Sequence, residues 1–419
     1  MARAPRSLPG RGVTARTAAV VASLALLLAA GCTGPSGAAS AGSAAAGSGS
    51  ERGSASTAPT TAPTPTPSPV DPAVAAADAA LARLDARQRA EQLLVVGVPA
   101  TDPAGGDALL ASAPYGGVFL RGRSKAAATD VGAVTTAWAQ AARDAGRPLP
   151  WVSADQEGGA VQTFSGDGFV DLPTARTQGR GTPEEVRGTA RGTGESLRTA
   201  GVNLDLSPVA DVVPEGTARG NAPVGRYGRE YGTTADAVTE DAGAVVAGLG
   251  EAGVTATVKH FPGLGRVTRN TDTSADVRDT ATTADDPDVA LFGQLAALPE
   301  RPFVMVSSAT YEQIDPGSIA AFSPVVVQQL LRGRLGFDGV VISDDVGEAT
   351  AVADVPVGER ATRFVAAGGT LVLTIDPDLA PAMVDALLER AAADPAFAAQ
   401  LDAAVRTALL AKARAGLLP

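Results

Sequence analysis

The sequence is poor in the residues that build disulfides and transition-metal sites. Its 419 residues include one cysteine, Cys32, and one histidine, His260. A single cysteine excludes an internal disulfide and a cysteine-based zinc site, and a single histidine excludes a site with several histidine ligands. We therefore expect the protein to use no metal and no cofactor. Any chemistry that needs an imidazole must use His260.

The chain also lacks an excess of positive charge. It carries 34 basic and 45 acidic residues, for a net charge of −11. Loss of the four arginines among the first 17 residues would change the net charge to −15. A protein this acidic is a poor candidate for binding nucleic acid. No G-x-G-x-x-G sequence opens a helix after an expected strand, so nothing supports a dinucleotide-binding fold.

The apolar run near the N-terminus is too short to span a membrane comfortably. It covers residues 18–30, whereas a span needs about 20 residues, and it has the length of a signal-peptide core. It leads into Ala29-Ala30-Gly31-Cys32, which resembles a bacterial lipobox. We therefore predict a lipoprotein signal peptide over residues 1–31 and a lipid anchor on Cys32 at the extracytoplasmic face of the cell membrane. An ordinary secretory signal with an incidental cysteine is the alternative.

Residues 32–70 consist almost entirely of Ala, Gly, Ser, Thr and Pro. This composition cannot build a hydrophobic core, so we predict a disordered tether. The rest of the chain, residues 71–419, is different, because short apolar runs recur in it between longer amphipathic or Ala-rich segments. With 45% hydrophobic residues, the chain can bury a sizeable core.

The spacing of the apolar runs indicates the fold. Strands are predicted at residues 93–98, 117–120, 149–154, 202–206, 254–258, 303–306, 340–342 and 370–374. Helices are predicted from Asp71 onward and at residues 124–145, 183–200, 233–252, 283–298, 323–334, 357–367 and 379–416. Eight strands that alternate with helices are typical of a (β/α)8 barrel. A doubly wound open sheet is the alternative that this pattern leaves open.

Charged residues follow several of the expected strands. They are Asp155 and Glu157, Asp205 and Asp211, Lys259 and His260, and Asp344 and Asp345. In a (β/α)8 barrel, the carboxyl ends of the strands face the active site. Each residue alone could be a helix cap or a loop acid. Together, carboxylates with one Lys-His pair suit glycoside hydrolysis, which needs a carboxylate nucleophile, a protonated acid and no cofactor.

Four motifs at these positions occur in a recognisable order. They are Asp155-Gln-Glu-Gly-Gly159, Leu206-Ser-Pro-Val-Ala-Asp211, Lys259-His-Phe-Pro-Gly263 and Ile342-Ser-Asp-Asp345. Over about residues 85–380 the chain resembles glycoside hydrolase family 3, and most of all its NagZ-type β-N-acetylglucosaminidase branch with actinobacterial lipoproteins. The resemblance implies a (β/α)8 barrel and retaining hydrolysis through a glycosyl-enzyme. It also implies substrates with β-linked N-acetylglucosamine, including cell-wall muropeptide fragments.

The resemblance assigns roles to particular residues. Asp344 matches the nucleophile, and Asp345 is its rival, although strand alternation should let only one of the two enter the pocket. Four residues match positions in the sugar subsite: Asp155, Lys259, His260 and, within Gly225-Arg-Tyr-Gly228, Arg226. For His260, a purely structural place in the barrel core is the alternative.

The acid/base departs from the branch pattern. The branch uses a histidine supported by an aspartate in the loop after Lys-His-Phe-Pro-Gly. Here Asp272 stands at the place of that histidine, and Asn270 at the place of its aspartate. Asp272 is therefore the predicted acid/base, provided that burial or a neighbouring charge raises its pKa. Glu157 and Glu348 are the alternatives.

Thr163 is a second departure, because the branch usually has an arginine there that contacts the sugar. Its loss leaves the sugar preference open. The prediction is a membrane-anchored, monomeric, retaining β-N-acetylhexosaminidase with a carbohydrate substrate. A glycan-binding lipoprotein with a degraded barrel and a β-glycosidase of different sugar preference are the alternatives.

Overall fold

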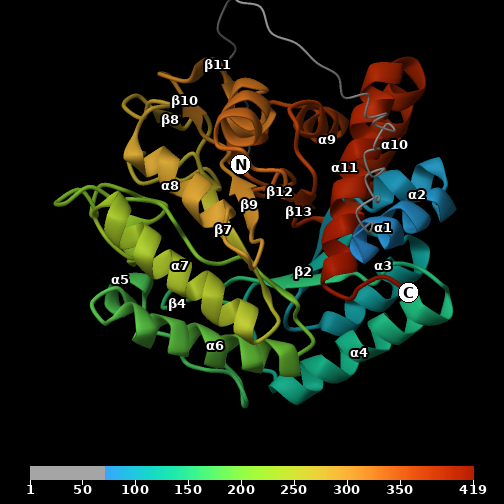
Figure 1. Cartoon of the computed structure of the whole chain (residues 1–419), viewed down its shortest axis with the longest axis horizontal. Coiled ribbons are helices and arrows are strands. Elements are labelled where there is room, and N and C mark those ends of the chain that lie inside the picture. The colour runs from blue at the N-terminus through green and yellow to red at the C-terminus, as the bar shows by residue number, and fades with distance from the viewer. Residues whose placement is uncertain (1–70) are drawn as a thin grey trace, which may run out of the picture. The chain divides into compact units, whose positions relative to one another are not determined.

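The computed structural model describes residues 71–419, in which helices surround a barrel of parallel strands (Figure 1). The predicted signal peptide, the tether and Cys32 lie outside the described residues. Within residues 71–419, no helix is both long enough and apolar enough to cross a bilayer.

The barrel strands follow one another around the ring in chain order. They are β1 (Leu94–Pro99), β2 (Gly117–Arg121), β3 (Trp151–Ala154), β6 (Leu204–Asp205), β7 (Thr255–Phe261), β9 (Phe303–Val306), β12 (Val341–Ser343) and β13 (Val372–Thr374). β13 pairs in parallel with β1, with Val372 opposite Leu94, and a bridge between Ile342 and Leu371 joins β12 to β13. The ring is thus closed, which confirms the (β/α)8 barrel and excludes the open sheet.

Helices lie between successive strands on the outside of the ring. They are α3 (Gly106–Ser112), α4 (Ala128–Asp144), α6 (Pro183–Thr199), α7 (Ala235–Glu251), α8 (Pro287–Ala296), the π-helix η4 (Val325–Arg334) and α9 (Val357–Ala366). Shorter elements occupy the loops: α5 (Ala175–Gln178), η1 (Pro103–Gly105), η2 (Gly225–Tyr227), η3 (Ala320–Phe322), η5 (Thr350–Val352) and η6 (Pro377–Leu379), the hairpin β4 (Gln156–Gly158) and β5 (Val161–Gln162), and a small sheet of β8 (Arg278–Asp279), β10 (Thr310–Tyr311) and β11 (Asp315–Ile319).

The first and last helices complete the ring side by side (Figure 1). α1 (Pro72–Arg83) and α2 (Ala86–Glu91) pack against α10 (Ala380–Ala393) and α11 (Pro395–Arg414). α1 begins as predicted, because the Asp71 carboxylate accepts the backbone N–H of Ala73 at 3.0 Å. The single helical segment predicted over residues 379–416 is two helices. Pro395 cannot continue the helix before it, and Asp394 caps α11 by accepting the backbone N–H of Ala396 at 2.9 Å.

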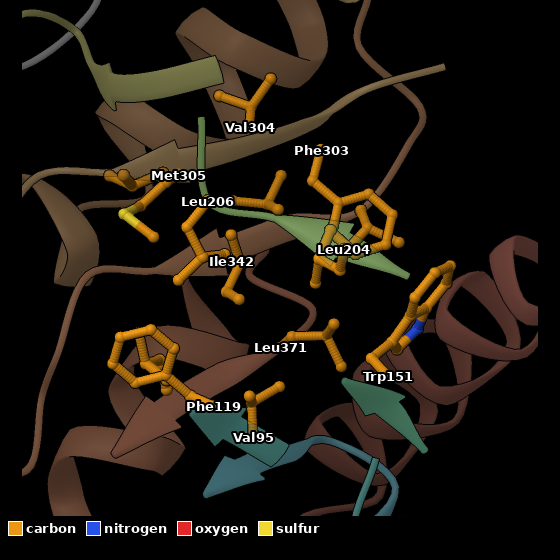
Figure 2. Packing of buried hydrophobic residues seen from close by; sticks show 14 of the residues in the cluster. Val95, Phe119, Trp151, Leu204, Leu206, Phe303, Val304, Met305, Ile342 and Leu371 are labelled. Carbon is orange, nitrogen blue, oxygen red and sulfur yellow. The ribbon is translucent and has the colours of Figure 1, made fainter. Parts of the chain in front are cut away.

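Apolar side chains fill the barrel interior. Figure 2 shows this packing, in which the Trp151 and Phe303 rings meet edge to face with centroids 5.1 Å apart. Trp151 begins β3, so this pair lies toward the amino ends of the strands. Phe119 and Met305 lie farther along their strands and also line the cavity described below. Because the interior is packed, ligands have access only at the ends of the barrel.

One buried charge-bearing group lies away from the strand ends. Lys412 on α11 is fully buried, and its Nζ has one hydrogen-bond partner, Gln92 Oε1, at 2.9 Å. Burial lowers the pKa of Lys412 to about 7. Between pH 7 and the ordinary lysine pKa, the unfolded chain therefore binds more protons at this residue than the folded protein does.

This difference predicts a pH-dependent contribution to stability. As pH rises from 7 to 9, the unfolding free energy of the wild type should increase relative to that of Lys412→Met. The increase should be up to ~1.4 kcal/mol per pH unit. Denaturant unfolding at pH 7, 8 and 9 measures this change. Lys125 is exposed, so Lys125→Met is the control variant. Its unfolding free energy should depend on pH in the same way as that of the wild type. Parallel curves for wild type and Lys412→Met would contradict the prediction.

Candidate active site

A cavity of about 300 Å³ opens at the carboxyl ends of the barrel strands. Its charged lining residues are Asp155, Arg229, Lys259, His260, Asp272, Asp344, Asp345 and Glu348. A larger hollow, of about 600 Å³, lies at the amino ends of the strands beside Trp151. Among residues 71–419, the smaller cavity brings together most of the predicted site residues, namely Asp155, Lys259, His260, Asp272 and Asp344, so we place the candidate active site there.

Two cations of the cavity wall bind one buried carboxylate behind it, that of Glu157. Lys259 Nζ lies 2.6 Å from Glu157 Oε1 and 2.7 Å from Asp155 Oδ1. Arg229 binds Glu157 through two bonds, Nη2 to Oε1 at 2.7 Å and Nε to Oε2 at 2.8 Å. Burial alone would raise the pKa of Glu157, but the Arg229 and Lys259 charges lower it to about 2. Glu157 is therefore ionised at neutral pH, which argues against it as the alternative proton donor.

Lys259 and His260 both line the cavity although they are neighbours on β7. Regular strand alternation would send them to opposite faces. The register of β7 against β9 shifts between Val258 and Phe261, and a bulge of this kind changes the direction of a side chain. His260 therefore lines the cavity, although its side chain is buried.

The sequence motifs assign no role to the residue that holds the His260 ring. His260 Nδ1 lies 2.7 Å from Asp211 Oδ2, and its Nε2 lies 3.5 Å from Arg229 Nη2. From the sequence, Asp211 is only an acid that follows an expected strand. The signal that could have found it is its place in Leu206-Ser-Pro-Val-Ala-Asp211, directly after β6, the strand that neighbours β7.

Asp344 and Asp345 both line the cavity, so the expectation that strand alternation admits only one of them is wrong, but their surroundings differ. The Asp345 oxygens are occupied by four backbone N–H donors, from Gly347, Glu348, Ala349 and Ile375. Asp344 accepts one backbone hydrogen bond, from Asp345 at 2.9 Å. Burial raises the pKa of Asp344 to about 6; the nearby His260 opposes this rise, and Asp272 adds to it. Asp344 is therefore the carboxylate left available for chemistry.

Asp272 lines the cavity from an exposed loop. The loop is fastened to η5, because the Asp272 carbonyl accepts the backbone N–H of Thr350 at 3.1 Å and its hydroxyl at 2.9 Å. Asn270 accepts the backbone N–H of Asp272 at 3.0 Å, so it supports the loop backbone. The structure thus brings Asp272 and Asp344 into one cavity. Glu348 also lines that cavity and is exposed.

The placement of Arg226 in the sugar subsite needs a correction. Arg226 is exposed on η2 and is absent from the cavity lining, whereas Arg229 lines it. The turn reverses at Gly228, which has a φ of 66°, and Arg229 Nη1 then donates to the Pro223 carbonyl at 2.9 Å. Both arginines follow a glycine in Gly-Arg-Tyr-Gly-Arg, and only the turn decides which one faces inward.

Thr163 does not reach the cavity either. It is buried, and its hydroxyl accepts the backbone N–H of Asp155 at 3.2 Å. Thr163 therefore positions Asp155 instead of contacting a sugar. Among residues 71–419, no group of three or more metal-ligating side chains is arranged to hold a metal ion.

Comparisons with known proteins agree with this architecture. A model of the glycosyl hydrolase family 3 N-terminal domain matches residues 86–409. A β-hexosaminidase of Bordetella avium (strain 197N) is 35% identical over 328 residues, which are 74% of this chain and 88% of that protein.

Solved structures are similar over most of the described chain. A β-N-acetylhexosaminidase from Beutenbergia cavernae DSM 12333 is 44% identical with a TM-score of 0.75, and the match covers 79% of this chain and 99% of that one. LpqI of M. tuberculosis is 28% identical with a TM-score of 0.68, covering 80% of this chain and 95% of that one. These matches confirm the fold and the family that the sequence motifs indicate. The chain belongs to glycosyl hydrolase family 3 and is a glycosidase.

Proposed function

We propose that this glycosidase is a retaining β-N-acetylhexosaminidase that removes terminal β-linked N-acetylglucosamine with Asp344 as nucleophile. The names of the β-hexosaminidase relatives and of the Beutenbergia cavernae structure support the sugar specificity. The observation that carries the mechanism is the contrast between Asp344 and Asp345. Asp344 faces the cavity with one backbone donor, whereas Asp345 is held by four.

The sugar is oriented by the charged side chains beside Asp344. Lys259 can donate hydrogen bonds to hydroxyls, Asp155 can accept them, and His260 presents Nε2 to the same space. These groups are already fixed by ion pairs and hydrogen bonds. The conformational entropy of these side chains is therefore lost when the protein folds and not when the substrate binds.

Catalysis proceeds in two steps on this arrangement. The Asp344 carboxylate attacks the anomeric carbon while the protonated Asp272 gives its proton to the leaving oxygen, and a glycosyl-enzyme forms. The ionised Asp272 then takes a proton from water, whose oxygen attacks the anomeric carbon and releases Asp344.

Removal of the nucleophile tests the proposal. We expect Asp344→Ala to lower kcat/KM on nitrophenyl β-N-acetylglucosaminide by roughly 1000-fold or more, because no other group can form the glycosyl-enzyme. Azide should partly restore turnover and yield a glycosyl azide of inverted anomeric configuration.

The matched variant is Asp345→Ala. This substitution should mainly lower the melting temperature, because the Asp345 carboxylate accepts four backbone hydrogen bonds that alanine cannot accept. Activity retained in Asp344→Ala but abolished in a folded Asp345→Ala would reverse the assignment. A wild type that binds the sugar without cleaving any β-glycoside would instead favour a glycan-binding protein.

A leaving-group comparison tests Asp272. A poor leaving group needs a proton in the transition state, whereas a dinitrophenolate does not. Asp272→Ala should therefore lower kcat/KM far more on a natural disaccharide than on a dinitrophenyl glycoside. Glu348→Gln is the matched control, since Glu348 is also exposed and lines the same cavity. Equal losses on both substrates in Asp272→Ala, or a selective loss in Glu348→Gln, would assign the acid elsewhere.

Muropeptide-type cell-wall glycans at the outer face of the cell membrane are the proposed natural substrates. The support for this location is the signal-like N-terminus and the lipobox-like sequence that ends at Cys32. The enzyme is proposed to act as a monomer, joined to its lipid anchor by residues 32–70.

Replacement of Cys32 tests the anchor. Cys32→Ala should move the protein from the membrane fraction to the soluble fraction or the medium, because the lipid attachment site is gone. Its specific activity should equal that of the wild type, since the cavity lies wholly within residues 71–419. Fractionation with activity assays measures both, and unchanged membrane association would argue against the lipid anchor.

A further inference from the structure

The only histidine of the chain is held by a carboxylate that does not line the cavity. Asp211 is 0% exposed and lies behind His260. Its Oδ2 lies 2.7 Å from His260 Nδ1, and its Oδ1 accepts the backbone N–H groups of His260 at 3.1 Å and Leu264 at 2.7 Å. Asp211 thus fixes both the ring and the backbone of the segment that carries it.

The bonds of Asp211 determine where the His260 ring carries its proton. Burial would raise the pKa of Asp211, but His260 and the two backbone donors hold it below the ordinary value. The carboxylate is therefore ionised and can only accept, so Nδ1 must carry a hydrogen. The other ring nitrogen, Nε2, faces Arg229 and the cavity.

The charges around the cavity show why this matters for Asp344. The positive charges of Lys259 and Arg229 are already engaged by Asp155 and Glu157. Asp344 and Asp272 bring two further carboxylates into the same cavity. The nearby His260, and to a smaller extent Lys259, lowers the pKa of Asp344 and so favours the ionised nucleophile.

Three charged groups lie at the His260 ring: Asp211 and Arg229, which contact it, and Asp344. Tyr311 lies near Asp211 and Asp344, and its hydroxyl donates to the Gly263 carbonyl at 2.9 Å. Burial raises the pKa of Tyr311 well above its ordinary value, so the phenol is neutral and adds no charge.

We propose that Asp211 is a positioning residue of the active site, which holds His260 with Nδ1 protonated and Nε2 facing the cavity and thereby favours the ionised form of Asp344. A carboxylate that accepts from Nδ1–H stabilises the imidazolium and fixes its orientation. The second half of this proposal rests on the proposed nucleophile, whereas the first half concerns His260 alone.

The test uses Asp211→Asn. Its amide oxygen can still accept the two backbone N–H groups, while its NH2 group faces Nδ1. The ring must then expose a lone pair at Nδ1 and carry its hydrogen on Nε2, and the imidazolium loses its partner. Asp205→Asn is the matched control. Asp205 is also buried and accepts a backbone N–H, that of Gln156 at 3.0 Å, and burial raises its pKa to about 8, so an amide is a close substitute.

The readout is the ¹⁵N NMR spectrum of the full chain labelled at histidine, where a single residue gives the signal. We expect the wild type and Asp205→Asn to show protonated Nδ1 and Asp211→Asn to show the opposite tautomer. A wild-type spectrum with hydrogen only on Nε2 would overturn the proposal, whether or not the variant folds.

The pH profile tests the link to Asp344. Without the partner that Asp211 provides, His260 favours the ionised form of Asp344 less. The acidic limb of the kcat/KM profile should therefore move to higher pH in Asp211→Asn and stay in place in Asp205→Asn. A shift of one unit makes the loss at pH 5 about tenfold larger than the loss at pH 8. Equal losses at both pH values would refute the link. Failure of Asp344 as nucleophile would appear in the azide experiment and would leave the NMR result unaffected.

Discussion

The site depends on one buried ammonium group, that of Lys259. Its side chain is 3% exposed and lies between the carboxylates of Asp155 and Glu157. Burial would lower the pKa of Lys259, but these two charges raise it above its ordinary value, so the lysine stays charged. Loss of one partner from such a buried pair typically costs about 3–5 kcal/mol. This cation therefore holds the end of β7 and the end of β3 in a fixed relation.

The same cluster gives chemically identical carboxyl groups different properties. Glu157 is ionised because two cations surround it, and Asp345 is occupied by backbone N–H groups. Asp211 is committed to His260. Asp344 and Asp345 both line the cavity, but Asp344 accepts one backbone hydrogen bond where Asp345 accepts four, and burial raises the Asp344 pKa to about 6. The division of labour thus follows from the neighbours of each carboxyl group, as in other hydrolases that use paired acids.

The barrel explains why these neighbours meet. Its interior is filled by side chains such as Trp151 and Phe303, so no ligand can enter between the strands (Figure 2). Parallel strands end at one rim, and residues far apart in the chain, such as Asp155 and Lys259, come within 2.7 Å there. The loops after β6 and β7 then add Arg229 and Asp272 to that rim.

Local patterns in the sequence were enough to predict the eight strands, the start of α1 and the charged residues at the strand ends. Hydrophobic periodicity and helix capping depend on a few neighbouring residues, and family motifs are read directly from the chain. The tertiary structure alone decided that Arg229 and not Arg226 faces inward, that β7 bulges to present both Lys259 and His260, and that Asp211 holds the histidine. These outcomes depend on strand register, loop reversal and partners from distant segments, which no local pattern specifies.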